Sequence, residues 1–203
     1  MTTLLRIDAD TLPRVLVLDP PMSDDEFEAL CLENDNVQFE RTKEGAIRMN
    51  PSAGGWTSSG NFEINRQLGA WWKTHKRGRC FDSSGGFRLP DGSTLSPDAS
   101  YLSENRLRQL PKGALRGFPH ACPDFVIELL SESDTLSTLQ SKMTDWIANG
   151  AEFAWLIDPY DRQVFVYRSK SALERFIGEQ LAGEGPVQGF TLNLSDVWDC
   201  YQD

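Results

Sequence analysis

Two acidic residues near the middle of the chain, Asp98 and Glu128, have the types and surroundings that suit metal-dependent chemistry. Glu128 lies in residues 123–130 (PDFVIELL), whose β-branched and aromatic residues indicate a buried strand. A charge inside such a strand costs free energy unless something compensates it. A divalent cation shared with Asp98, which lies in residues 96–101 (SPDASY), would compensate it through oxygen ligands. Pairing with an arginine or capping a loop is the alternative for Glu128.

A second acid of the same strand, Asp124, is harder to place at one ion. Side chains alternate along a strand, so Asp124 and Glu128 point to the same face. Four residues at ~3.3 Å each nevertheless separate them by ~13 Å, and both cannot bind one ion without a bulge. Asp124 is therefore either an accessory ligand or a structural residue that caps the strand or pairs with a basic loop residue.

Two predicted helices must lie against these acids. Residues 59–75 carry apolar side chains at helical spacing, and Glu63 lies in the first turn. The helix dipole favours an acid there, so Glu63 is either a dipole partner or a metal ligand. In the helix 135–149, Lys142 and Gln140 lie on the two edges of the apolar stripe. Lys142 can extend along apolar surface toward a buried site or into solvent, whereas Gln140 reaches only the other side.

The remaining segments predict an α/β domain without internal repeats. Ser23 and Glu26 have the spacing of a capping box, which predicts a helix that continues to about Glu33. The other predicted elements are a hairpin over 37–49, strands at 80–83, 86–89 and 94–101, a hairpin over 151–168, a short helix at 171–177 and a strand at 189–194.

Length and composition are those of a soluble globular protein. The 203 residues are enough for one domain with a sizeable core, at 39% hydrophobic and 25% charged residues. No run approaches the roughly 18 apolar residues of a membrane span, and the first ten residues lack the pattern of a signal peptide. Four scattered cysteines give neither zinc spacing nor a disulfide framework, so we expect a cytoplasmic protein.

The distribution of charge matters more than its sum. The formal net charge is −10, which argues against a nucleic-acid partner. Residues 61–120, however, hold 10 bases and 5 acids, a net of +5. A polyanion such as DNA could bind this basic segment, although scattered surface charge could also serve solubility. The bases predicted to bind nucleic acid are Lys73, Lys76, Arg77, Arg106 and Arg108.

Several motifs in a fixed order resemble those of a known family. They are residues 87–92 (FRLPDG), 96–100 (SPDAS), 122–129 (CPDFVIEL), Lys142-Met143, 149–151 (NGA) and 155–159 (WLIDP). This order is similar to the PD-(D/E)XK superfamily, and more closely to a cyanobacteria-rich family of proposed restriction endonucleases that was formerly a domain of unknown function. The resemblance covers roughly residues 20–170.

The resemblance implies a restriction-endonuclease-like fold, in which a curved mixed sheet is flanked by helices. We expect one domain over 1–203, with an N-terminal helix-hairpin extension over 1–50, a nuclease core over 51–170 and a C-terminal segment over 171–203.

The same resemblance implies metal-assisted hydrolysis of phosphodiester bonds. Asp98 and Glu128 would hold Mg²⁺ or Mn²⁺, and Glu63 matches a further acid that the first helix often supplies. The lysine expected two residues after the second acid is absent, because that position is Leu130. Lys142 is the candidate to replace it as the third catalytic residue and to stabilise the transition state. A homodimer is a family expectation.

Three functions remain open at this point. The leading one is a Mg²⁺-dependent DNA endonuclease. A nuclease-fold binding or interaction module without catalysis is the alternative, and the displaced lysine and the acidic net charge favour it. A metal-dependent hydrolase of small phosphoesters is the third, but the basic segment favours a polymeric substrate.

Overall fold

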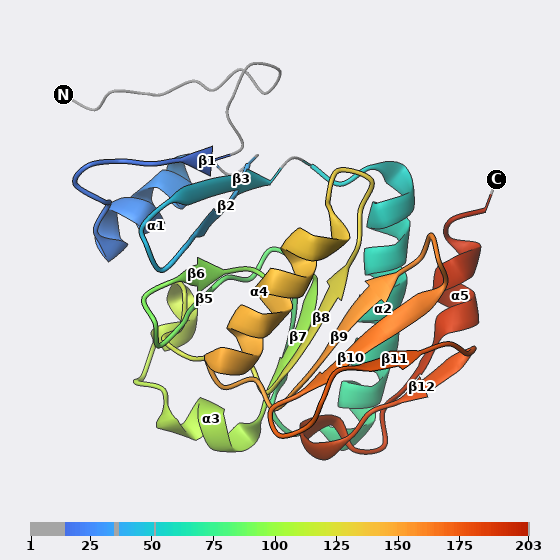
Figure 1. Ribbon diagram of the computed structural model, residues 1–203. Coiled ribbons are helices and arrows are strands. Elements are labelled where there is room, and N and C mark those ends of the chain that lie inside the picture. The colour runs from blue at the N-terminus through green and yellow to red at the C-terminus, as the bar shows by residue number, and fades with distance from the viewer. Residues whose placement is uncertain (1–14, 35–36, 51, 203) are drawn as a thin grey trace.

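Two β-sheets form the frame of the computed structural model, which describes residues 15–34, 37–50 and 52–202 (Figure 1). The larger sheet is mixed, because β8 and β9 are parallel while its other neighbouring strands are antiparallel. In spatial order its strands are β11 (Glu174–Phe176), β10 (Gln163–Arg168), β9 (Phe153–Asp158), β8 (Phe125–Leu129), β7 (Ala99–Leu102) and β4 (Arg79–Asp82).

The smaller sheet combines the beginning of the chain with two short strands from its middle. In spatial order its strands are β1 (Val15–Leu16), β3 (Ile47–Asn50), β2 (Gln38–Arg41), β6 (Thr94–Leu95) and β5 (Phe87–Arg88). The predicted N-terminal hairpin is present as β2 and β3, and it shares this sheet with β5 and β6. A further antiparallel pair consists of β12 (Gln180–Ala182) and β13 (Thr191–Asn193).

Helices cover both faces of the larger sheet (Figure 1). Phe125 of β8 packs in one core with Ile64 of the second helix, and Val126, which points the other way, packs in a second core with Met143 of the fourth. The strand is buried on both faces, as its apolar sequence predicts. The α-helices are α1 (Asp24–Glu33), α2 (Gly55–His75), α3 (Glu104–Gln109), α4 (Leu136–Ala148) and α5 (Leu194–Asp199).

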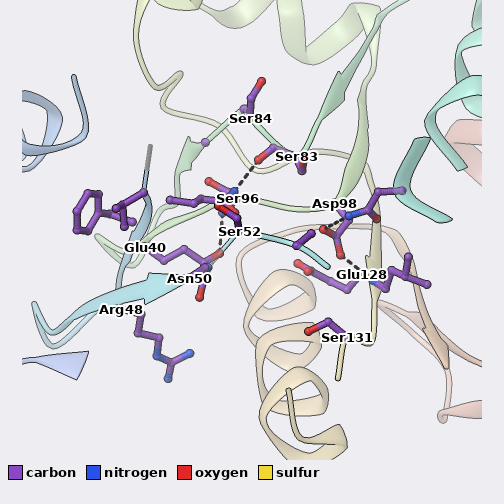
Figure 2. Close-up of a pocket in the computed structure, with 18 of the residues that line it drawn as sticks. Glu40, Arg48, Asn50, Ser52, Ser83, Ser84, Ser96, Asp98, Glu128 and Ser131 are labelled. Atoms are coloured by element: carbon purple, nitrogen blue, oxygen red, sulfur yellow. Dashed lines mark hydrogen bonds between the residues drawn. The ribbon is translucent and has the colours of Figure 1, made fainter. Parts of the chain in front are cut away.

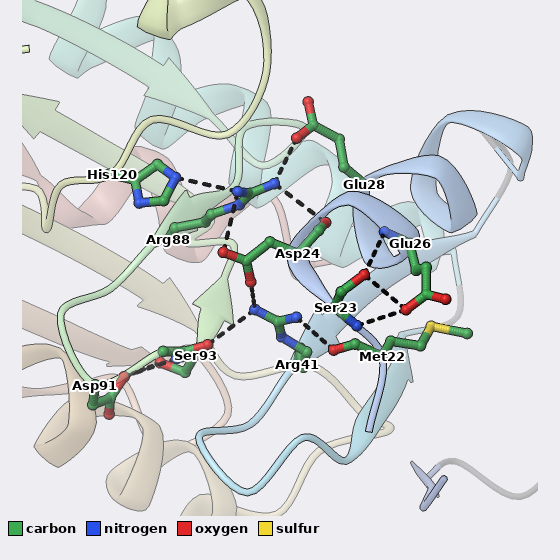
Figure 3. Close-up of polar contacts among 11 residues, drawn as sticks. Met22, Ser23, Asp24, Glu26, Glu28, Arg41, Arg88, Asp91, Ser93 and His120 are labelled. Carbon is green, nitrogen blue, oxygen red and sulfur yellow. Dashed lines mark hydrogen bonds and ion pairs between the residues drawn. The ribbon is translucent and has the colours of Figure 1, made fainter. Parts of the chain in front are cut away.

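Ion pairs fix α1 to the smaller sheet (Figure 3). The predicted capping box is present, since Ser23 and Glu26 bond each other's backbone N–H groups. Asp24 then lies between Arg41 of β2, with which it forms an ion pair, and Arg88 of β5 at 3.3 Å. Both guanidinium groups are largely shielded from solvent, so these contacts hold the helix against the sheet.

Two sequence predictions about secondary structure are wrong. Residues 94–101 do not form one strand, because Pro97 lacks the N–H that a continuous ladder needs, and the chain passes from β6 in one sheet to β7 in the other. Residues 171–177 contain strand β11 in place of a helix, because Phe176 pairs with Val164 and extends the larger sheet.

Candidate active site

Glu128 accepts hydrogen bonds from two residues of α4. Its carboxylate lies 2.9 and 3.0 Å from the Lys142 ammonium, and the Trp146 indole N–H donates to Oε1 at 2.8 Å. Lys142 and Trp146 are four residues apart and therefore lie one above the other on the helix. The helix delivers both donors to the acid that interrupts the apolar face of β8.

Asp98 is brought beside Glu128 by the register of β7 and β8. Ala99 pairs with Ile127, so Asp98, one residue earlier, stands opposite Glu128 across the antiparallel strands. Asp98 accepts a hydrogen bond from the Leu129 backbone N–H at 2.7 Å and another from Asn61 of α2 at 3.1 Å. Pro97 ends the preceding strand and leaves this acid at the point where the two sheets diverge.

A third acid, Glu40 of β2, reaches the same place from the smaller sheet. Its Oε1 lies 2.8 Å from the Lys142 ammonium and accepts the Ser96 backbone N–H at 2.9 Å. Lys142 also donates to the Ser96 carbonyl at 2.8 Å. An ammonium has three N–H donors, and here Glu128, Glu40 and Ser96 accept all three.

This cluster has more negative than positive charge. Burial, reinforced by the charges of Asp98 and Glu40, raises the pKa of Glu128 to about 8, although Lys142 acts in the opposite direction. Burial likewise raises the pKa of Asp98. For Lys142 burial alone would lower the pKa, but the surrounding carboxylates outweigh it and raise the pKa, so the ammonium stays charged. Three acids thus share one lysine.

The cluster forms the floor of a pocket of about 1150 Å³ (Figure 2). Both sheets contribute, with Glu40, Arg48 and Asn50 from the smaller one and Asp98 and Glu128 from the larger one. The walls combine apolar and aromatic side chains with six serines, namely Ser52, Ser83, Ser84, Ser96, Ser131 and Ser133. The close-up shows the carboxylates of Asp98 and Glu128 directed toward the same space.

The model of one protein family matches most of the chain. Its description is "Uma2: Putative restriction endonuclease", and it covers residues 24–195. The chain belongs to this family. The match therefore confirms the family that the ordered motifs predict, and it extends beyond the predicted limits of roughly 20–170 at the C-terminal end.

A solved structure confirms the restriction-endonuclease-like fold of this Uma2 chain. It is described as "a putative nuclease belonging to DUF820 from Anabaena variabilis", with 23% sequence identity and a TM-score of 0.68 over 81% of this chain and 91% of that one. A cryo-EM structure of a DrdV–DNA complex aligns with 57% of this chain and 9% of its own, at 15% identity and a TM-score of 0.35. No functionally curated protein matches the chain.

The donor set of this Uma2 site fits Mg²⁺ or Mn²⁺ in charge and chemistry. Asp98 and Glu128 present carboxyl oxygens, and the acids outnumber Lys142, so a divalent cation could offset the mutual repulsion that helps to raise the pKa of Glu128. Mg²⁺ is typically held by one or two carboxylates and keeps several waters. No three His, Cys, Asp or Glu side chains gather as a ligand set within residues 15–34, 37–50 and 52–202. A cation here would depend on Asp98, Glu128 and solvent.

Two other predicted site residues, Glu63 and Gln140, lie away from this pair. Glu63 bonds Arg66 and Gln67 along α2, whereas Asn61 and Asn65 of that helix contact the Asp98 carboxylate and backbone carbonyl, respectively. Gln140 is half-buried and is not among the residues that line the pocket.

Asp124 has structural contacts at the start of β8. It accepts the Ser103 backbone N–H at 2.6 Å and forms an ion pair with Arg106 at 2.8 Å. These contacts match the structural alternative that the sequence leaves open for Asp124, a cap combined with a basic partner.

The bases predicted to bind nucleic acid are not at the pocket. Lys73, Lys76 and Arg77 lie at the end of α2, which runs from the pocket to the opposite end of the molecule (Figure 1). Arg106 bonds Asp124 and the backbone, and Arg108 pairs with Glu104. None of these five bases lines the pocket that holds Asp98, because a net positive segment of sequence need not form one surface. The exposed or half-buried bases that do line the pocket are Arg48 and Arg116.

Sequence reasoning missed Glu40, Asn61 and Trp146 as members of the site. Trp146 belongs to the apolar stripe of α4, and nothing in its spacing shows that its N–H meets a carboxylate. Glu40 carries only a weak signal in the sequence. It is an acid inside a predicted strand, and the structure shows that its neighbours Phe39 and Arg41 are buried.

No helix of the described residues is long and apolar enough to cross a membrane.

Proposed function

We propose that the protein is a metal-dependent DNA endonuclease that hydrolyses phosphodiester bonds at the floor of this pocket. The observation that carries the proposal is the convergence of Asp98, Glu128 and Lys142 at one pocket in a chain of the Uma2 family. Asp98 directly precedes β7, Glu128 lies in β8 and Lys142 in α4, and these elements hold the three residues rigidly, as a catalytic site requires.

Asp98 and Glu128 would hold the cation. When bound, Mg²⁺ or Mn²⁺ would polarise the scissile phosphate and lower the pKa of an attacking water. Lys142 would supply positive charge to the oxyanion, a contribution that is typically 10²–10³-fold in turnover. Glu40 and Ser96 orient that ammonium, since both accept its N–H groups. Donation to a substrate oxygen requires Lys142 to exchange one of its three present acceptors.

The test is cleavage of supercoiled plasmid and of single-stranded circular DNA in Mg²⁺ or Mn²⁺, with and without a chelator. The wild type should cut at least one of these substrates, the chelator should abolish cleavage, and Asp98→Asn should be inactive. The matched control is Asp25→Asn, which alters an exposed acid in the first turn of α1 and should retain activity. Cleavage that survives both the chelator and Asp98→Asn would refute the proposal.

One observation favours the alternative of a nuclease-fold binding module without catalysis. All three donors of Lys142 already have acceptors inside the protein, as in a lysine that only balances buried acids. If this function is correct, DNA binding should be retained while both DNA substrates stay intact in either metal.

A further inference from the structure

Exposed aromatic rings stand on one wall of the pocket. Trp56, in the first turn of α2, and Tyr160, in the turn between β9 and β10, both line the pocket and are 43% and 44% exposed. Tyr201 contacts both, with ring centroids 6.4 Å from Trp56 and 5.7 Å from Tyr160. Contact with a third ring limits the motion of these two while part of their surface stays open to a ligand. Such rings can stack on planar groups.

Trp56 lies on the helix that reaches the acids, and its side chain lines the same pocket. Asn61, which bonds Asp98, follows Trp56 by five residues on α2. At 1.5 Å per residue the two positions differ by about 7.5 Å along the helix axis. This corresponds to about two nucleotide steps at ~3.4 Å each, and to fewer in an extended strand. Because Trp56 and the acids line the same pocket, a strand with one base on Trp56 could continue toward the acids.

Glu128 and Lys142 are too deeply buried for a phosphate of an intact duplex to reach easily. Glu128 is 2% exposed and Lys142 is 7% exposed, at the bottom of a pocket that both sheets enclose. A strand whose bases are free to turn away from a partner can enter such a site, whereas a paired strand must first be unstacked, at a cost of a few kcal/mol.

The charges around the pocket also fit a single strand better than a duplex. Apart from Lys142, the bases that line it are Arg48 and Arg116, and the acids Glu132 and Asp134 lie at its edge. Duplex-binding proteins commonly make about 6–10 phosphate contacts with basic side chains. Proteins that bind single strands obtain much of their affinity from bases stacked on aromatic rings, at ~1–3 kcal/mol per base.

On the basis of the proposed function, we infer that the pocket takes single-stranded or locally unpaired DNA, with one base stacked on Trp56. Tyr160 is placed to contact a neighbouring base, and Arg48 and Arg116 are placed to contact phosphates. The serine-lined wall, which includes Ser83, Ser84 and Ser131, offers hydroxyl groups to the strand.

The test is fluorescence anisotropy with a labelled DNA strand of about 12 nucleotides, alone and annealed to its complement, in buffer with chelator so that nothing is cleaved. The single strand should bind about tenfold or more tightly than the duplex. Trp56→Ala should weaken single-strand binding about 5- to 150-fold, the equivalent of one stacked base. Trp56→Phe keeps an aromatic face and should retain most of the affinity.

Phe62→Ala is the matched control, because Phe62 is a 70% exposed ring on the same helix that does not line the pocket. It should bind like the wild type. Equal or tighter binding of the duplex would overturn the inference, and so would equal affinities of Trp56→Ala and Phe62→Ala.

These results separate the inference from the endonuclease activity. Trp56-dependent binding of the single strand by a protein that cuts no DNA in Mg²⁺ or Mn²⁺ would uphold the inference and refute the activity. Cleavage of duplex DNA that needs Asp98 but is unchanged in Trp56→Ala would do the opposite.

Discussion

Replacing Lys142 by methionine removes the one positive charge at the floor of the pocket while keeping much of the side-chain volume. Glu128 and Glu40 then lose a partner at 2.8–3.0 Å, and the Ser96 carbonyl loses its donor. Breaking a buried ion pair on one side typically costs ~3–5 kcal/mol. For a chain of this size each kcal/mol lowers Tm by about 2–4 °C, so Tm should fall by about 6–20 °C.

The loss of stability should depend on pH. Without Lys142, the carboxylates that remain buried bind protons more tightly, so the folded variant retains protons that the unfolded chain releases. Stability therefore falls as pH rises, and falls more steeply than in the wild type. The difference in free energy of unfolding between the two proteins should be larger at pH 8 than at pH 5.

Urea unfolding followed by circular dichroism at both pH values measures this difference. Lys112→Met, which removes an exposed lysine, should change the free energy of unfolding by less than about 0.5 kcal/mol and serves as the control. Adding Glu40→Gln to Lys142→Met should recover part of the loss, because it removes a buried charge without a partner. A Lys142→Met protein as stable as the Lys112→Met protein at both pH values would refute the reasoning.

Three further outcomes follow from the site. Mg²⁺ or Mn²⁺ should raise Tm in the wild type and much less in Asp98→Asn, because the cation relieves repulsion between Asp98 and Glu128; equal responses in a thermal shift assay would count against a metal site. Burial raises the pKa of Glu128 to about 8, so the folded protein holds a proton there that the unfolded chain releases above about pH 4.5. The stability that this proton gives is lost as pH rises from about 4.5 to 8, and Glu128→Gln should show a flatter dependence of Tm on pH over that range. Asp124→Asn should cost ~1–3 kcal/mol, because a Ser103 bond and the Arg106 pair are weakened, while the Tm response to metal persists; loss of that response would assign Asp124 to the metal site.

The sequence was most informative about the local elements. The capping box at Ser23, the hairpin of β2 and β3, and the strand of Glu128 all depend on neighbouring residues, and each is present in the structure. The prediction failed where distant segments decide the outcome. Residues 171–177 have helical spacing, yet β10 offers a free edge that pairs with β11.

The same distinction applies to the candidate site. Glu128 could be proposed because it stands out in an apolar strand, and Asp98 because it lies in one of the ordered family motifs, and the pairing of β7 with β8 brings the two together. Glu40 could not be placed there, because the sequence does not show that the smaller sheet closes over the larger one. The basic residues 73–77 looked relevant by number alone, but α2 places Lys73 about 12 Å, and its last residue His75 about 15 Å, beyond Asn65, which bonds the Asp98 backbone.

The contact between Glu40 and Lys142 has a consequence for how the chain folds. The two residues come from opposite halves of the sequence and from different sheets, so they meet after a long loop has closed. During synthesis, β2 leaves the ribosome well before α4, and Glu40 lacks the Lys142 ammonium until that helix docks. The smaller sheet can therefore bury its acid stably only when the larger sheet is complete, and this makes the N-terminal strands a late-closing element of the fold.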